Sequence, residues 1–403
     1  MSEAGFRAAF ELAAWSWAEH LRSGGTTTWR EWRASEHLAV SARWPALPTA
    51  AQLEVVRLLA ERERLGGEHR DPSFARLAAL VIGTPVGGRG LVDVPLAWPE
   101  SPQVVGARAV EPDDLPPDEL LRVCVSAIVR TTLSDSLGPG RPVKAHRRPW
   151  RRAFVVAGVS AHAESVRAAL LDAGQVEGGR RPTVLVVGAP LDVMMAMHWR
   201  RRVEAGAGVR WRRVWSGSAA RDALPAPVDV AALADDWASR VGAENVHVVL
   251  ERDPADAVTV AGRVLDVGLG SVDDQSADVV QTDLLRRINQ MLAIRGSEAT
   301  RAFRASVFGQ FLFRSSRGEP LGVPDRQLGW AVEQAEAMAT RLGAGCYAVH
   351  GDPRVVVPSS DAALRRSVDP RDTLEHGLGA LAECERLARA TARSGRKTRE
   401  GGH

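Results

Sequence analysis

Apolar residues recur at steps of three and four positions through most of the first 135 residues, which is the spacing of amphipathic helices. Phe6, Phe10 and Trp17 form one such stripe near the N-terminus. Later helices are expected after the capping residues 26–28, after 48–49, over about 72–82, and over about 118–132. Residues 1–135 are therefore predicted to form an α-helical N-terminal domain.

The pattern changes at Ala153. The runs AFVVAG, TVLVVG and NVHVVL are short, apolar and rich in β-branched residues, and each is followed by a turn and a helical pattern. Continuous apolar strands that alternate with helices are typical of a parallel sheet covered on both faces. Residues 153–372 are therefore predicted to be an α/β domain with a mainly parallel sheet and flanking helices.

Two charged segments flank this predicted domain. The first, 136–152, combines glycines and prolines with six Arg or Lys residues, and it is predicted to be a basic linker. The second, 373–403, begins with an amphipathic pattern and ends in RATARSGRKTREGGH. It is predicted to be a charged, partly disordered tail.

The overall charge is nearly balanced, because the 403 residues include 52 Lys or Arg and 49 Asp or Glu. Such a balance does not predict nucleic-acid binding. Cys124, Cys346 and Cys384 lie far apart and outside any metal-ligand spacing, which predicts buried free thiols in a reducing compartment. The N-terminus lacks signal-peptide features, and no apolar run approaches the roughly 20 residues that cross a bilayer. A soluble, cytoplasmic protein is expected.

Lysine is almost absent from the chain. Only Lys144 and Lys397 occur, and neither follows a glycine-rich loop at the end of a strand. A P-loop of the form GxxxxGK[ST] needs a lysine on the transferring phosphate. The glycines of GTPVGGRG, 83–90, fit neither this motif nor GxGxxG. The sequence therefore contains no recognisable nucleotide-phosphate loop, and a metal site is not predicted either.

The loop after AFVVAG is the first candidate site. It runs from Gly158 to Ser165 and leads from a strand into a helix, whose N-terminal N–H groups can bind an anion. Gly158, Ser160 and Ser165 are its candidate binding residues, and His162 could add a side-chain contact. Ser160 is also an ordinary helix cap, which is the favoured interpretation.

The loop after TVLVVG is the second candidate. Asp192 is expected to cap the following helix, in which Met194, Met195, Met197 and Trp199 are expected to lie in the core. Arg200, Arg201 and Arg202 form either a solvated face or an anion clamp, to which Arg210, Arg212 and Arg213 would add charge. Arg200 and Arg202 are the preferred anion ligands of this helix.

Other signals are weaker. The basic linker surrounds Trp150 with arginines, a pattern that can bind nucleic acid or an acidic surface, although a solvated linker is favoured. The stretch VWSGSAA is expected to be a turn, and the motif GxSxG does not occur. Asp235 and Asp236 are expected in the first turn of a helix.

The second half of the chain resembles the sulfotransferase-like proteins of actinobacteria, a branch of the P-loop α/β sulfotransferases. The matching stretches, between about 183 and 358, are TVLVVGAPLDVMMAMHW, RRRVEAGAGVRWRRVW, LADDWASRVGAENVHVVLERDP, DLLRRINQML and WAVEQAEAMATRLGAGCYAVHGDPRVVVP. The resemblance implies a P-loop-like fold and a transferase that uses the sulfuryl donor 3′-phosphoadenosine 5′-phosphosulfate (PAPS).

The sequence departs from this family where the donor would bind. Family members begin with a PKSGTT-like loop, whose lysine position would fall on Ala161 or a neighbour if 158–165 is its remnant. A TARD-like loop supplies an arginine for the 3′-phosphate, and here Gly188, Ala189 and Pro190 occupy it. Both phosphate anchors are missing, so the resemblance implies a degenerate active site.

Three functions remain open. The leading one is a non-catalytic binding or accessory protein with an anionic small molecule or a protein as its partner and no cofactor. The second is an active transferase that binds PAPS through arginines, with His162 as the acid–base residue at the carboxyl edge of the sheet. The third is a nucleic-acid or acidic-surface binder that uses the linker and tail.

Overall fold

The computed structural model describes most of the chain and divides it into two compact units. The first unit comprises Met1–Gly140, Met291–Phe311 and Pro370–His403, and the second comprises Arg141–Gln290 and Leu312–Asp369. The described residues are 3–35, 48–65, 74–85, 96, 110–134, 153–179, 182–270, 278–306, 309, 321–358 and 367–400. The predicted basic linker, 136–152, and most of the 83–90 loop lie outside them.

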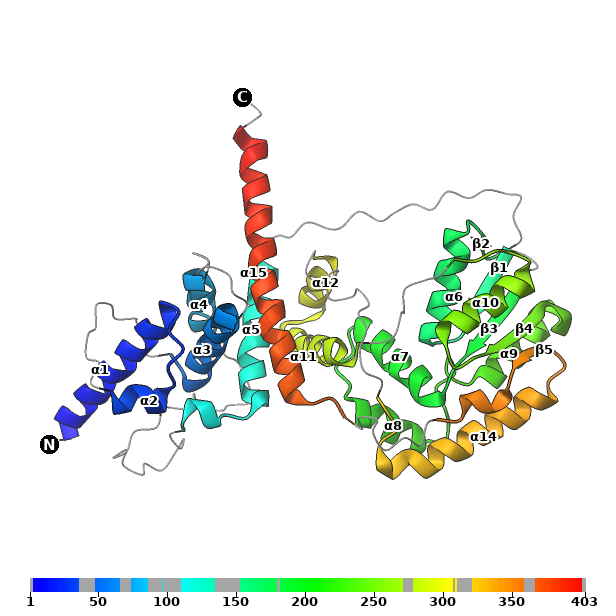
Figure 1. The fold of residues 1–403 in the computed structure, drawn as a ribbon, viewed down its shortest axis with the longest axis horizontal. Helices are drawn as coiled ribbons and strands as arrows, with labels where there is room; N and C mark the ends of the chain where they lie inside the picture. Colours follow the sequence, from blue (N-terminus) through cyan, green and yellow to red (C-terminus); the bar gives the residue numbers. More distant parts are fainter. Residues whose placement is uncertain are drawn as a thin grey trace. The chain divides into compact units, whose positions relative to one another are not determined.

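The first unit consists of helices in its described parts (Figure 1). They are α1 (Glu3–Arg22), α2 (Trp29–Ala34), α3 (Ala50–Leu65), α4 (Phe74–Ile82), η1 (Pro112–Asp114), α5 (Pro117–Ser134), α12 (Ser297–Ala305) and α15 (Pro370–Glu400). Thr28 begins α2 through a capping box with Glu31, as its sequence predicts. Trp17 and Trp29 are fully buried between the first helices, with ring centroids 5.2 Å apart.

The described part of the C-terminal segment forms a long helix. Residues 373–400 of the predicted charged, partly disordered tail lie in α15, which packs against α5 in the first unit. Leu381 and Cys384 are fully buried there, and the Cys384 thiol lies 3.7 Å from the Thr132 hydroxyl. A helix that buries one apolar face gains tertiary stabilisation, which composition alone does not reveal.

The second unit has an α/β fold with a parallel sheet, and this prediction is confirmed (Figure 1). The strands are β1 (Ala153–Ala157), β2 (Val176–Glu177), β3 (Thr183–Gly188), β4 (Val246–Leu250) and β5 (Ala348–Gly351). All neighbouring strands are parallel, in the order β2-β1-β3-β4-β5. The short edge strand β2 is not expected from the sequence because it lacks an apolar run.

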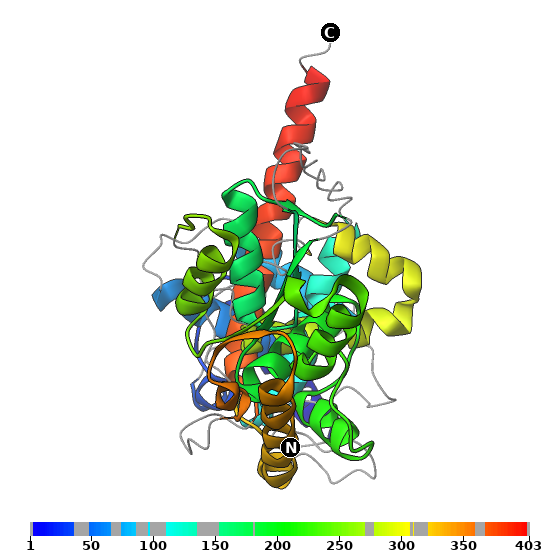
Figure 2. The same cartoon turned by 90° about the vertical axis from the view of Figure 1, so that its right-hand side faces the viewer.

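Helices cover both faces of this sheet, as continuous apolar strands require. On one face α6 (Ala161–Asp172) and α10 (Pro254–Leu265) lie side by side (Figure 2). They bury alternate strand residues such as Phe154, Leu185 and Val249. On the other face α9 (Val230–Val241) packs against β3 and β4, and α14 (Leu328–Ala344) packs on α9.

The remaining elements of the second unit are α7 (Leu191–Glu204), α8 (Trp211–Ala219), η2 (Ala243–Asn245), α11 (Val279–Arg295), η3 (Asp325–Gln327) and η4 (Pro353–Val356). The last turn of α11, from Met291, belongs to the first unit. No helix in the described ranges is both long enough and apolar enough to cross a membrane.

Three local predictions are wrong. VWSGSAA is not a turn but lies in α8, where Trp211 and Trp215 are buried. Asp235 and Asp236 lie in the middle of α9, since this helix begins at Val230 after the cap Asp229. Cys346 is exposed, whereas Cys124 and Cys384 are buried as expected, and all three are free thiols.

Candidate functional site

The carboxyl ends of the parallel strands define where a ligand is expected. The chain leaves β1 toward β2 on one side and continues through β3 and β4 on the other. Ligands of open α/β sheets bind outside the carboxyl edge where the strand order reverses in this way. In this protein that switch point lies between the loops that follow β1 and β3, which are the two loops singled out from the sequence.

The β1 loop is short and held tightly against β3. Gly158 has a φ of +115°, and a Cβ atom there would lie only 2.5 Å from the carbonyl oxygen of Val187. Ser160 caps α6, as expected, because its hydroxyl accepts a hydrogen bond from the N–H of Ala163 at 3.0 Å. The Ser160 carbonyl accepts the N–H of Glu164 at 3.2 Å. These N–H groups are satisfied within the helix and are not offered to an anion.

The side chains of this loop are buried. Ser160 is fully covered, Ser165 is 2% exposed and His162 is 3% exposed. The Nε2 atom of His162 lies 3.1 Å from the carbonyl oxygen of Arg252, in the loop after β4. The histidine therefore joins two loops at the carboxyl edge of the sheet, and its ring is covered by protein.

The arginines of α7 are engaged by acids. Arg200 binds Glu204 of the same helix at 2.7 Å, and Arg201 forms an ion pair with Glu164 of α6. Glu164 also contacts Arg167 at 3.2 Å. Arg202 is exposed and lies near His198, whose pKa is lowered to about 4 by burial and then by the Arg202 charge. The three arginines thus do not converge on one anion site.

Asp192 lies in the first turn of α7, but it is not the cap. Pro190 occupies the cap position, and no side chain caps the helix. The Asp192 residue is only 2% exposed, and its Oδ1 atom has no hydrogen-bond partner among the described residues. Burial raises the pKa of Asp192 to about 6, against the opposing effects of backbone N–H groups and Arg252. A buried acid of this kind makes the switch point less favourable for a phosphate.

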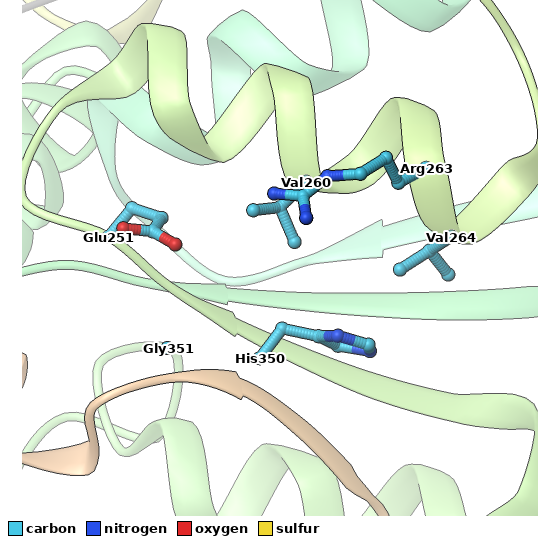
Figure 3. Close-up of a pocket in the computed structure, with 6 residues that line it drawn as sticks. All are labelled: Glu251, Val260, Arg263, Val264, His350 and Gly351. Carbon is cyan, nitrogen blue, oxygen red and sulfur yellow. The ribbon is translucent and has the colours of Figure 1, made fainter.

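A pocket opens elsewhere along the same edge of the sheet. It has a volume of about 300 Å³ and is lined by Glu251, Val260, Arg263, Val264, His350 and Gly351 (Figure 3). Glu251 directly follows β4, His350 and Gly351 end β5, and the other three residues belong to α10. None of these residues is predicted as a site residue from the sequence. The sequence feature that could have indicated the pocket is the polar residue directly after the strand VHVVL, together with the histidine near the end of the strand AVHG.

A pair of histidines supports the floor of this pocket. The strand register places His247 and His350 on the α10 face of the sheet, and the His247 Nδ1 and His350 Nε2 atoms are 3.2 Å apart. Their rings are nearly parallel, with centroids 5.4 Å apart. Burial, and then the neighbouring His350, lowers the pKa of His247. In the described part of the chain, no group of three or more His, Cys, Asp or Glu residues could hold a metal ion.

Helices α7, α8, α11 and α14 form one connected scaffold. The rings of Trp199, Trp211, Trp215 and Trp330 follow one another at centroid distances of 5.8, 5.6 and 6.4 Å, across α7, α8 and α14. Asn289 of α11 donates hydrogen bonds to the carbonyls of Val203 and Ala207 at 2.7 and 3.1 Å. These residues hold the end of α7 and the following loop in place.

Comparison with known proteins does not identify the chain. No protein-family model, no curated protein and no solved structure matches it. The function must therefore be argued from the geometry of the switch point and the pocket.

Proposed function

We propose that this chain is a degenerate sulfotransferase-like protein that binds a partner or small ligand without transferring a sulfuryl group. One observation carries the proposal: the side chains expected to contact a donor phosphate are buried in the protein. Ser160, His162 and Ser165 are buried there, and the loop N–H groups of Ala163 and Glu164 are already hydrogen bonded. These two N–H groups are therefore not available to an anion.

The electrostatics of the switch point support the same proposal. Transfer of a charged group needs positive charge fixed where negative charge develops. The chain has no lysine in the β1 loop, and Gly188, Ala189 and Pro190 follow or end β3 where the family has an arginine. Arg201 is paired with Glu164, while Asp192 adds a buried carboxyl group nearby. A polyanionic donor would therefore lie near acidic side chains at a position where its binding requires positively charged ones.

The connected scaffold of α7, α8, α11 and α14 supports the sulfotransferase-like part of the proposal. The quoted stretches lie on adjacent elements of one folded unit. The parallel sheet is compatible with this fold family. Because a fold hosts many functions, the scaffold alone does not carry catalysis.

Thermal denaturation in the presence of nucleotide tests the proposal. A ligand at 100 times its Kd stabilises a folded protein by about 2.7 kcal/mol. We expect neither PAPS nor adenosine 3′,5′-bisphosphate to raise the Tm, and a sulfotransferase with an intact phosphate loop serves as the positive control. A rise in Tm that saturates with PAPS would favour the active transferase. Steeply salt-dependent binding of a DNA duplex would instead favour a nucleic-acid binder.

A further inference from the structure

The pocket beneath α10 lies at the carboxyl ends of β4 and β5 (Figure 3). It is thus on the edge of the sheet at which ligands of open α/β folds collect. Its existence follows from the topology, because β5 is the edge strand while α10 packs mainly on β4 and β3. The end of β5 is therefore left partly uncovered, and the four residues of this strand are exposed or half-buried.

The pocket carries one permanent positive and one negative side chain. Arg263 is exposed at the rim, and Glu251 is half-buried. Within the residues that the structure describes, neither of them forms an ion pair or a side-chain hydrogen bond. Other acids and bases of this unit do pair, as Arg341 does with both carboxylate oxygens of Asp229 at 3.0 and 2.6 Å. Both charges of the pocket are thus available to a ligand.

Two valines and a histidine ring line the space between the charges. Val260 and Val264 lie one turn apart on α10 and form one wall. His350 faces them from β5, and its contact with His247 at 3.2 Å holds the imidazole ring in place (Figure 3). Pockets that bind small molecules combine such apolar walls with a few polar groups that fix orientation, and 300 Å³ is at the small end of their range.

We propose that this pocket binds a small zwitterion of the size of a free amino acid. Its carboxylate would pair with the Arg263 guanidinium, which suits carboxylates through parallel N–H donors. Its ammonium group would pair with Glu251, and its side chain would lie between the two valines and His350. The inference goes beyond the proposed function, since it holds whether or not the switch point binds PAPS.

Ligand-observed NMR on the full chain tests this inference. Each common free amino acid is added singly up to about 10 mM, above the ~1 mM Kd of a weak small-molecule site. For any amino acid that binds, its N-acetyl and carboxamide derivatives each remove one charge. We expect at least one amino acid to bind, and each derivative to bind about tenfold more weakly or not at all, because each loses one charge-assisted contact. Failure of all free amino acids to bind would overturn the proposal.

Two variants locate the site. Glu251→Gln should weaken the amino acid about tenfold and remove the penalty for N-acetylation, and Arg263→Gln should do the same for the carboxamide. Arg212→Gln and Glu336→Gln, at exposed positions of α8 and α14, are the matched controls and should leave binding unchanged. An amino-acid affinity that is unchanged in both pocket variants would overturn the proposal. Binding of inorganic phosphate that needs Arg263 but does not depend on Glu251 would also overturn the proposal. Such a result would mean that the pocket is an anion site.

Discussion

The imidazole of His162 and the backbone carbonyl of Arg252 are 90 positions apart in the chain, yet their atoms Nε2 and O lie 3.1 Å from each other. This contact joins the β1 loop to the β4 loop at the carboxyl edge of the sheet. A histidine that acts on a substrate must reach the substrate's proton. His162 is instead covered by protein and bound to the backbone, which is the arrangement of a structural residue.

His162→Ala should therefore lower stability. We expect the free energy of unfolding in urea to fall by about 1–3 kcal/mol, because a buried contact is lost and its partner carbonyl is left behind. Ser165→Ala is the control: its buried hydroxyl has no hydrogen-bond partner among the described residues, so its removal should not lower stability. Equal stability of His162→Ala and the wild type would contradict the structural role.

Asp192→Asn should stabilise the protein at neutral pH and lose this advantage in acid. Burial raises the folded-state pKa of Asp192 from 3.8 to about 6, so the folded protein binds more protons than the unfolded chain between these values. Stability from this group is thus present below pH 4 and is lost as the pH rises through 6. The shift corresponds to at most roughly 3 kcal/mol.

Urea unfolding of wild type and Asp192→Asn at a series of pH values from about 4 to 8 measures this effect. The gain in unfolding free energy of the variant should grow between about pH 4 and pH 6 and level off above about pH 7. A gain that does not depend on pH would show that Asp192 keeps an ordinary pKa in the folded state.

Gly158→Ala should be strongly destabilising. The substitution adds the strain of a φ of +115° to a contact of 2.5 Å between the new Cβ and the Val187 carbonyl oxygen. We expect a loss of about 2–4 kcal/mol in unfolding free energy. Gly178→Ala is the matched control, because its φ is +99° with no atom within 4 Å, and it should cost about 1 kcal/mol. Equal losses would mean that the β1 loop is not held against β3.

Asn289→Ala should loosen the end of α7. It removes two hydrogen bonds, to the carbonyls of Val203 and Ala207, from a residue that is 3% exposed. We expect a loss of about 2–3 kcal/mol. The neighbouring Gln290 is exposed; its side chain donates a hydrogen bond to the Gly208 carbonyl at 3.0 Å and accepts one from Arg286 at 3.0 Å. Gln290→Ala should cost less than about 1 kcal/mol, because water can replace exposed hydrogen bonds. Amide hydrogen exchange at the end of α7 should rise in the first variant and not in the second.

The sheet could be predicted from the sequence because its signal is local. The runs that become β1, β3 and β4 are each continuous and β-branched, and helical patterns separate them. Met194, Met195, Met197 and Trp199 are buried, as their apolar spacing suggests. The order of α15 could not be predicted, since its stability depends on packing against α5, more than 200 positions away.

The state of the candidate site was not predictable for the same reason. The sequence places Gly158, Ser160, His162 and Ser165 in one loop, whereas the structure begins α6 at Ala161, so His162 and Ser165 lie in the helix. Arg200 and Arg202 lie in one helix, as predicted. Whether these groups face a ligand depends on distant partners such as Glu164 for Arg201 and the Arg252 carbonyl for His162. The pocket likewise combines α10 with the ends of β4 and β5, so no single motif could indicate it.

The central claim is that the switch point of this sheet does not bind the sulfuryl donor. Equilibrium dialysis of the full-length wild-type protein against radiolabelled PAPS measures this directly, with unlabelled adenosine 3′,5′-bisphosphate as competitor. We predict no saturable retention of label at donor concentrations up to about 1 mM, a level at which even a weak site would be half occupied. Saturable retention that the bisphosphate displaces, and that Arg201→Gln or His162→Ala abolishes, would contradict the account.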